Sequence, residues 1–322
     1  MSILETPDIV SKNLKKTYLI ILSVLFLLLF PTIISAVELS ISTDSDLGSG
    51  TFQNTVQSDT GVSVELESNG TWNALTWKTP DKTLGPGSAF TSDGSYIYVV
   101  RGYGDILLWR YSYITDSWET LTNLPTGAYY GSDIQYLNGY IYVIFGGYQN
   151  TFARYSIEDA EWDMLNSYPE LVYQGASMTT DGTDIYTITS NNSQGFYKYS
   201  VADDSWVSLA GTPATLRYGS DLERVGNYIY TPRGSGTNTF YRYDIITNTW
   251  DTMATMPGTM NDDVDITSAN GYIFISRQYN STSFYKYEIA TNTWTTLTDA
   301  PLASRYAGVQ YLSSEGDRKS VV

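Results

Sequence analysis

Four landmarks recur every 44 residues along this chain, and this repeat restricts the possible folds more than any other feature. Independent landmarks in one unbroken register do not arise by chance, so the chain is built from tandem units. The landmarks are Trp118, Trp162, Trp206, Trp250 and Trp294; Pro125, Pro169, Pro213, Pro257 and Pro301; Tyr96, Tyr140, Asp184, Tyr228 and Tyr272; and Tyr111, Tyr155, Tyr199, Tyr243 and Tyr287.

Residues 131–169 show what each unit encodes. Short runs rich in aromatic and β-branched residues predict four strands, at about 131–137, 140–145, 152–156 and 161–165. Asn138-Gly139 lies between the first two and suits a two-residue type I′ hairpin turn, which needs positive φ at both positions. No helical period occurs in the unit. A period of about 40 to 50 residues with four strands is typical of a β-propeller blade.

The units resemble the kelch repeat. In residues 131–169, a second strand ending in Gly146-Gly147 is followed by Tyr155, six residues and Trp162. The Tyr-to-Trp spacing holds in all five units, whereas the diglycine is complete only at 146–147. The resemblance covers residues 87–312 and implies an all-β, kelch-like propeller of the galactose-oxidase-like superfamily. It also implies that the first strand of each blade lines the central channel, and that the repeated tryptophans and the diglycine have structural roles.

The two ends of the repeat region are expected to close the ring together. Residues 51–57, 62–66 and 72–75 look like the last three strands of a blade, and 305–312 look like its first strand. Pairing these segments would hide the edges of an open array. We therefore expect six blades, five complete and one composite. The propeller would span 59–312, after a Ser/Thr/Asp-rich linker and first strand at 37–58.

Residues 1–36 read as a signal peptide. Lys12, Lys15 and Lys16 precede an apolar run at 18–30, and a small-residue stretch ends at Ala36. An uncleaved membrane anchor is the alternative, and both interpretations predict a secreted or cell-surface protein.

At the C-terminal end, residues 313–322 interrupt the repeat where a strand is due. Residues 317–322 match a translated sequencing adapter, so we expect them to be non-native; a natural polar tail is the alternative.

Composition excludes several kinds of chemistry. The net charge of −16 argues against nucleic acid and anionic membrane surfaces as partners. The chain has no His and no Cys, so histidine-dependent catalysis and the copper site of the kelch-fold oxidases are impossible. We expect no cofactor and no metal. Carboxylate catalysis remains open, because Asp262 and Asp265 lie in the densest acidic cluster and a glycosidase needs only two acids.

The expected ligand surface is the face on which two kinds of loop gather around the channel mouth. Tyrosine can stack on a sugar and form hydrogen bonds, and arginine can bind carboxylates. The predicted function is a monomeric, non-catalytic recognition module for an extracellular glycan or protein. The alternative is a glycosidase- or lyase-like enzyme; for any single residue, simple filling of the channel rim is an equal alternative. The candidate binding residues are Tyr130, Tyr173, Arg217, Tyr218, Asp262, Arg305, Tyr306, Arg101, Arg233 and Arg277.

Overall fold

The computed structural model describes residues 82–112, 114–189, 192–261, 264–277 and 281–299 in full, and four further strands by their backbone alone. All of them belong to one compact unit, Leu47–Val322. In these residues every regular element is a strand, and no helix long and apolar enough to cross a membrane is found. The predicted signal segment and the tail at 313–322 lie outside the described residues.

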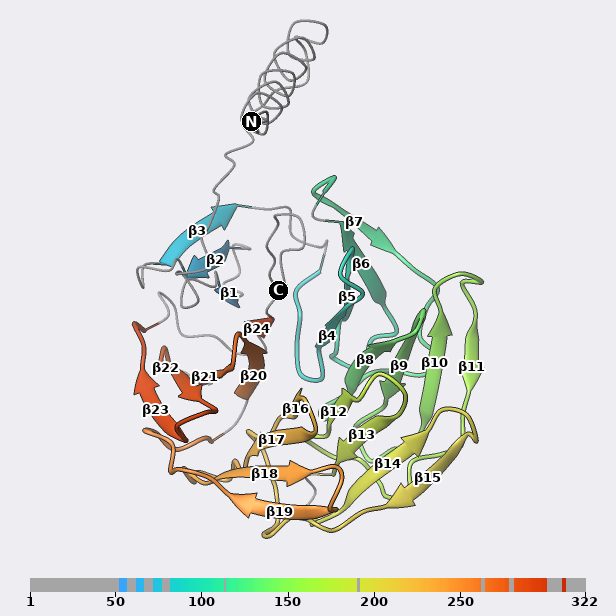
Figure 1. Cartoon of the computed structure of the whole chain (residues 1–322). Coiled ribbons are helices and arrows are strands. Elements are labelled where there is room, and N and C mark those ends of the chain that lie inside the picture. Colours follow the sequence, from blue (N-terminus) through green and yellow to red (C-terminus); the bar gives the residue numbers. More distant parts are fainter. Residues whose placement is uncertain are drawn as a thin grey trace, which may run out of the picture. The chain divides into compact units, whose positions relative to one another are not determined.

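The strands form consecutive four-stranded antiparallel blades, each joined to the next by a loop (Figure 1). This confirms a β-propeller of four-stranded blades. Blade 1 is β4 (Ala89–Ser92), β5 (Ile97–Val100), β6 (Leu108–Ser112) and β7 (Ser117–Thr120), and blade 2 is β8 (Asp133–Leu137), β9 (Tyr140–Ile144), β10 (Phe152–Ser156) and β11 (Trp162–Met164).

Three more blades repeat this arrangement. Blade 3 is β12 (Ser177–Thr180), β13 (Ile185–Ile188), β14 (Phe196–Ser200) and β15 (Ser205–Ser208); blade 4 is β16 (Glu223–Val225), β17 (Tyr228–Pro232), β18 (Phe240–Asp244) and β19 (Thr249–Thr252); blade 5 is β20 (Val264–Ala269), β21 (Tyr272–Arg277), β22 (Phe284–Glu288) and β23 (Thr293–Thr296).

The expectation of six blades is met in part, because the fully described residues form five blades rather than six. A further four-stranded sheet is described by its backbone. It joins the two ends of the repeat region in the order β24 (Val309–Gln310), β1 (Phe52–Val56), β2 (Val62–Leu66) and β3 (Trp72–Thr76). In this sheet Gln53 pairs with Gln310 and Asn54 with Val309. The pairing matches the predicted composite, but no side-chain packing is described there.

The predicted turn between the first two strands of blade 2 is confirmed. Asn138 and Gly139 both have positive φ, 49° and 87°, as a type I′ turn requires. The turn sets the register of the hairpin, in which Leu137 faces Tyr140 and Asp133 faces Ile144. Local sequence therefore fixes which residues of β8 and β9 face each interface.

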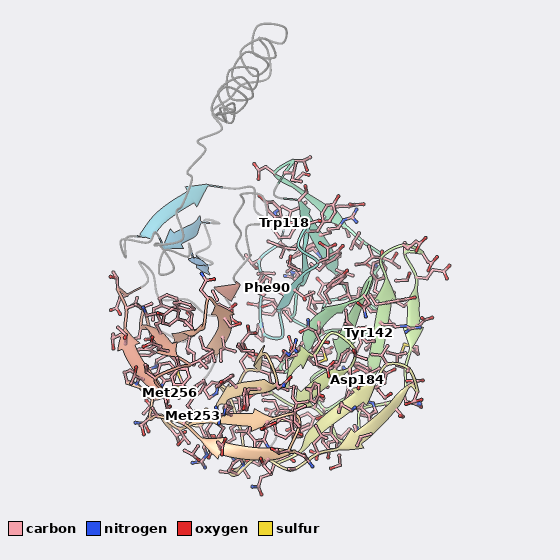
Figure 2. All side chains as sticks on the ribbon, viewed as in Figure 1. Phe90, Trp118, Tyr142, Asp184, Met253 and Met256 are labelled. Carbon is pink, nitrogen blue, oxygen red and sulfur yellow. The ribbon has the colours of Figure 1, made fainter. Side chains whose placement is uncertain are left out.

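Blades 2 to 5 pack on one another through three aromatic side chains per interface, whereas Leu108 takes the place of the phenylalanine between blades 1 and 2. Phe152 on β10 lies edge-on against Tyr199 and Trp206 of blade 3, with ring centroids 4.8 and 4.9 Å apart. Phe196 contacts Tyr243 and Trp250 of blade 4 in the same way. Side chains fill the interfaces throughout, and Figure 2 marks Tyr142 at the blade 2–3 interface, where it packs on Phe152 and Tyr199. The repeated Tyr and Trp are thus residues of the blade interface.

The tryptophans also tie each fourth strand to the blade before it. Trp206 Nε1 donates to the carbonyl oxygen of Asn166 at 2.9 Å, and Trp250 to that of Ala210 at 2.8 Å. These side chains are half-buried, because β15 and β19 lie on the outside of the propeller. A half-buried indole with a bonded N–H stabilises an interface less than a fully buried one.

Candidate functional site

Two sets of loops meet on one face of the described blades. The 2–3 loops join second and third strands, and the inter-blade loops precede the first strands. In blade 2, Gly147 N donates to Tyr130 O at 2.9 Å, and Tyr148 N donates to Val172 O at 2.7 Å. A 2–3 loop therefore bonds to the inter-blade loop of its own blade and to that of the next blade. Blades 1 and 4 repeat both bonds.

Consecutive left-handed residues make this double bonding feasible. Gly147 and Tyr148 have φ of 76° and 64°, which turns their two N–H groups toward different loops. The same positions in blade 4 are Ser235 and Gly236, with φ of 55° and 70°. Steric contact explains the first glycine of the pair, because a Cβ on Gly146 would lie 1.9 Å from the carbonyl oxygen of Tyr130. Gly146 and Gly147 therefore allow the loops to approach closely.

Several tyrosines are exposed on these loops. Tyr148 is 61% exposed and stacks on Tyr173, with ring centroids 4.3 Å apart and an interplanar angle of 24°. Tyr218 is near enough to interact electrostatically with Tyr148. Tyr129 packs against the backbone of Gly104 and Gly147, where an added Cβ would meet its side chain. Tyr103, Tyr129, Tyr130, Tyr148, Tyr173 and Tyr218 are hereafter the loop-face tyrosines.

The predicted arginines are less available than the sequence suggested. Arg101 Nη1 bonds to Asp105 Oδ2 at 2.7 Å and its Nε to Thr83 O at 3.0 Å. Arg233 Nε donates to Thr215 O at 3.5 Å, the same bond in blade 4. Both side chains therefore brace loops. Arg217 is exposed and donates from Nε to the Asn192 side chain, so it stays at the surface near Tyr218.

The other predicted residues divide into two groups. Tyr130 is 45% exposed and Tyr173 half-buried, both in inter-blade loops as expected, and Arg277 ends β21. Asp262, Arg305 and Tyr306 lie outside the described residues. Tyr173, Arg217 and Tyr218 lie in the inter-blade loops that precede blades 3 and 4. Their role in binding stays a proposal.

A second cluster lies on the first strands, which are innermost in Figure 1. Asp133, Ser177, Asp221 and Asp265 occupy one register position in blades 2 to 5, 44 residues apart. Asp133 Oδ2 accepts a bond from Met178 N at 2.6 Å, and Asp221 Oδ2 from Ile266 N at 3.2 Å. The carboxyl groups of Asp133 and Asp221 thereby bond to the backbone of the next blade. We call Asp133, Asp221, Asp265 and Glu223 the inner-strand carboxyl cluster.

These carboxyl groups hold protons unusually strongly. Burial, together with the nearby charge of Asp221, raises the pKa of Asp133 to about 8. Burial raises the pKa of Glu223 to about 7, and it also raises those of Asp221 and Asp265. Among the described residues no three acidic side chains are placed as metal ligands would be. The geometry instead suits protonated carboxyls that bridge blades.

Sequence reasoning missed several of these residues. Tyr103 was missed because it replaces the second glycine of the diglycine, and Tyr148 because it lies just outside the motif; an aromatic residue in the loop was in both cases the available signal. Asp133, Asp221 and Glu223 were also missed. Asp221 and Asp133 lie 44 and 132 residues before Asp265, so the repeat register was the signal that could have identified them. Only the inter-blade bonds of the inner strands reveal what they do.

The fold defines the class: a β-propeller protein, an architecture consistent with a binding or recognition module. No protein-family model matches the sequence, and no curated protein matches it. Solved structures do match in fold. One is titled "Structure of YjhT", with a TM-score of 0.60 and 11% sequence identity over 73% of this chain and 89% of that chain. At this identity the likeness shows the fold alone.

Proposed function

We propose that this chain is an exported, kelch-like propeller that recognises a glycan through its loop face without catalysis. The observation that carries the proposal is the exposure of the loop-face tyrosines on a rigid frame. Large apolar side chains exposed together are typical of interaction sites. Here they belong to loops bonded on both sides, so the surface is preorganised and little ordering entropy is lost on binding.

Export and closure belong to the same proposal. The basic and apolar residues of 1–36 support secretion or surface attachment. Six-blade closure is supported by the backbone pairing of β1 with β24. A closed propeller needs no partner to cover sheet edges, which supports a monomeric protein.

Two observations favour other functions. Ile106 and Leu171 are 39% and 53% exposed in the same loops, which suits a protein ligand. Asp221 and Asp265 lie side by side in register with raised pKa values, as an acid/base pair of a carbohydrate-active enzyme would. The Asp221 carboxylate is, however, occupied by a hydroxyl donor of blade 3 and a backbone donor of blade 5. Structural bridging therefore accounts for them better than catalysis.

A glycan array probed with the full-length protein tests the proposal. The matched variant replaces Tyr173, Arg217 and Tyr218 by Ala, and the thermal midpoint of both proteins is measured. We expect binding by the wild type, loss of binding by the variant and similar midpoints. An array that stays silent while the loop face captures a protein would overturn glycan recognition; release of cleaved sugar would overturn the non-catalytic role.

A further inference from the structure

Tyr148 occupies a backbone position that disfavours it. Its φ of 64° lies in the left-handed region, where a residue with a large side chain is strained. The equivalent positions of blades 1, 3 and 4 hold Gly104, Asn192 and Gly236, all residue types that adopt this conformation readily. Only in blade 2 does the repeat place a large aromatic there.

The fold does not need this side chain. The bond from Tyr148 N to Val172 O uses the backbone, and Gly236 makes the equivalent bond to Met260 O at 2.6 Å. The Tyr148 ring is 61% exposed and stacks on Tyr173. A strained backbone kept for an exposed ring is a sign of function.

Two other tyrosines lie close to Tyr148. Its ring stacks on that of Tyr173, and Tyr129, which is 47% exposed, packs against the neighbouring Gly147. Arg217 and Asn192 provide polar groups and bond to each other. Among the described residues, no carboxylate lies within ion-pair distance of Arg217.

The chemistry selects a class of ligand. A tyrosine ring offers an apolar face to the C–H face of a pyranose, and its hydroxyl can bond to sugar hydroxyls. The net charge of −16 repels polyanions. The geometry points to a binding platform for a neutral oligosaccharide, formed by the stacked rings of Tyr148 and Tyr173. This assignment rests on the proposed function and specifies its ligand and its sector of the loop face.

The test is calorimetric titration of the full-length protein with neutral hexasaccharides of β-linked glucose, xylose, mannose and N-acetylglucosamine. Oligogalacturonate serves as the acidic comparison. Tyr148→Gly restores the residue found at Gly236, and Tyr148→Phe keeps the ring. Ile246→Ala is the control, because Ile246 is 73% exposed in the turn between β18 and β19. Tyr148→Asn, which copies Asn192, replaces the Gly variant if that variant does not fold.

We expect a neutral hexasaccharide to bind the wild type, with affinity at least about tenfold lower in Tyr148→Gly, which corresponds to about 1.4 kcal/mol. Tyr148→Phe should retain most of the affinity, Ile246→Ala all of it, and every thermal midpoint should stay close to the wild type. Equal binding by wild type and Tyr148→Gly, or binding of oligogalacturonate alone, would overturn the platform while leaving glycan recognition intact. Failure to bind any oligosaccharide, neutral or acidic, would overturn both.

Discussion

Ser177 Oγ donates a hydrogen bond to Asp221 Oδ1 at 2.5 Å, across 44 residues and between the inner strands of blades 3 and 4. The same Ser177 oxygen accepts a bond from Leu222 N at 2.9 Å, and Asp221 Oδ2 accepts one from Ile266 N of blade 5. Asp221 therefore connects three consecutive blades. One side chain at a repeated register position thus links neighbouring blades through their innermost segments.

Removing that connection should be costly. Asp221→Ala leaves the donors on Ser177 and Ile266 without their partner in the interior, so we expect a loss of about 2–4 kcal/mol in the free energy of unfolding. Asp221→Asn keeps an acceptor oxygen and should cost less. Urea titration measures both, and a double-mutant cycle with Ser177→Ala isolates the pair. Equal midpoints for Asp221→Ala and wild type would show that the bond contributes nothing.

The carboxyl cluster predicts the direction of pH dependence. Asp133 and Glu223 have folded-state pKa values of about 8 and 7, above the ~4 of unfolded carboxyls. The folded state thus binds more protons than the unfolded state between about pH 4 and 8, and stability falls as pH rises through this range. The urea midpoint should be higher at pH 5 than at pH 8. Asp133→Asn with Glu223→Gln should flatten the dependence; an unaltered slope in that variant would remove the cluster as its cause.

The diglycine offers a test of close loop packing. Gly146→Ala would place a Cβ 1.9 Å from the Tyr130 carbonyl oxygen, a backbone contact that can be relieved only by moving a loop. We expect a cost of about 2–3 kcal/mol, as for overpacked sites. Gly139→Ala is the control, because its added Cβ meets nothing within 4 Å and only its positive φ is penalised. Comparable thermal midpoints for the two variants would mean that steric contact at Gly146 is unimportant.

The tryptophan position should matter moderately. Trp206→Ala removes the edge contact with Phe152 and the bond to Asn166 O, but the indole is half-buried. We expect about 2–3 kcal/mol, less than the 3–5 kcal/mol typical of buried aromatic truncations. Trp206→Phe, which keeps the ring contact and loses the N–H, should cost about 1 kcal/mol. Chemical denaturation measures both variants. Midpoints equal to that of the wild type in both would show that Trp206 does not stabilise the interface.

Much of the architecture was predictable because it depends on local and periodic features. The 44-residue register located every described blade, and Asn138-Gly139 specified its turn through backbone conformation alone. The tyrosines of the inter-blade loops were expected on one face for the same reason. Register counting carries no information about contacts, however. It therefore placed Arg101 and Arg233 at the surface without showing that each bonds to a carbonyl oxygen.

The blade count and the inner cluster show where sequence reasoning ends. Pairing of β1 with β24 joins segments more than 250 residues apart, and only a spatial arrangement reveals it. Asp133 and Asp221 look like ordinary strand-end carboxylates in the sequence. Their raised pKa values come from the neighbouring inner strands, which no single repeat contains. Tyr148 was overlooked because left-handed φ is a property of the folded loop.

Hydroxyl-radical footprinting of the full-length protein, with and without the oligosaccharide that it binds on the array, tests the loop-face assignment most directly. Oxidation of Tyr148, Tyr173 and Tyr218 should fall when the sugar is added. Oxidation of Met164, which is 60% exposed on the outer strand β11, should remain unchanged. Protection at Met164 with undiminished oxidation of the three tyrosines would contradict recognition through the loop face.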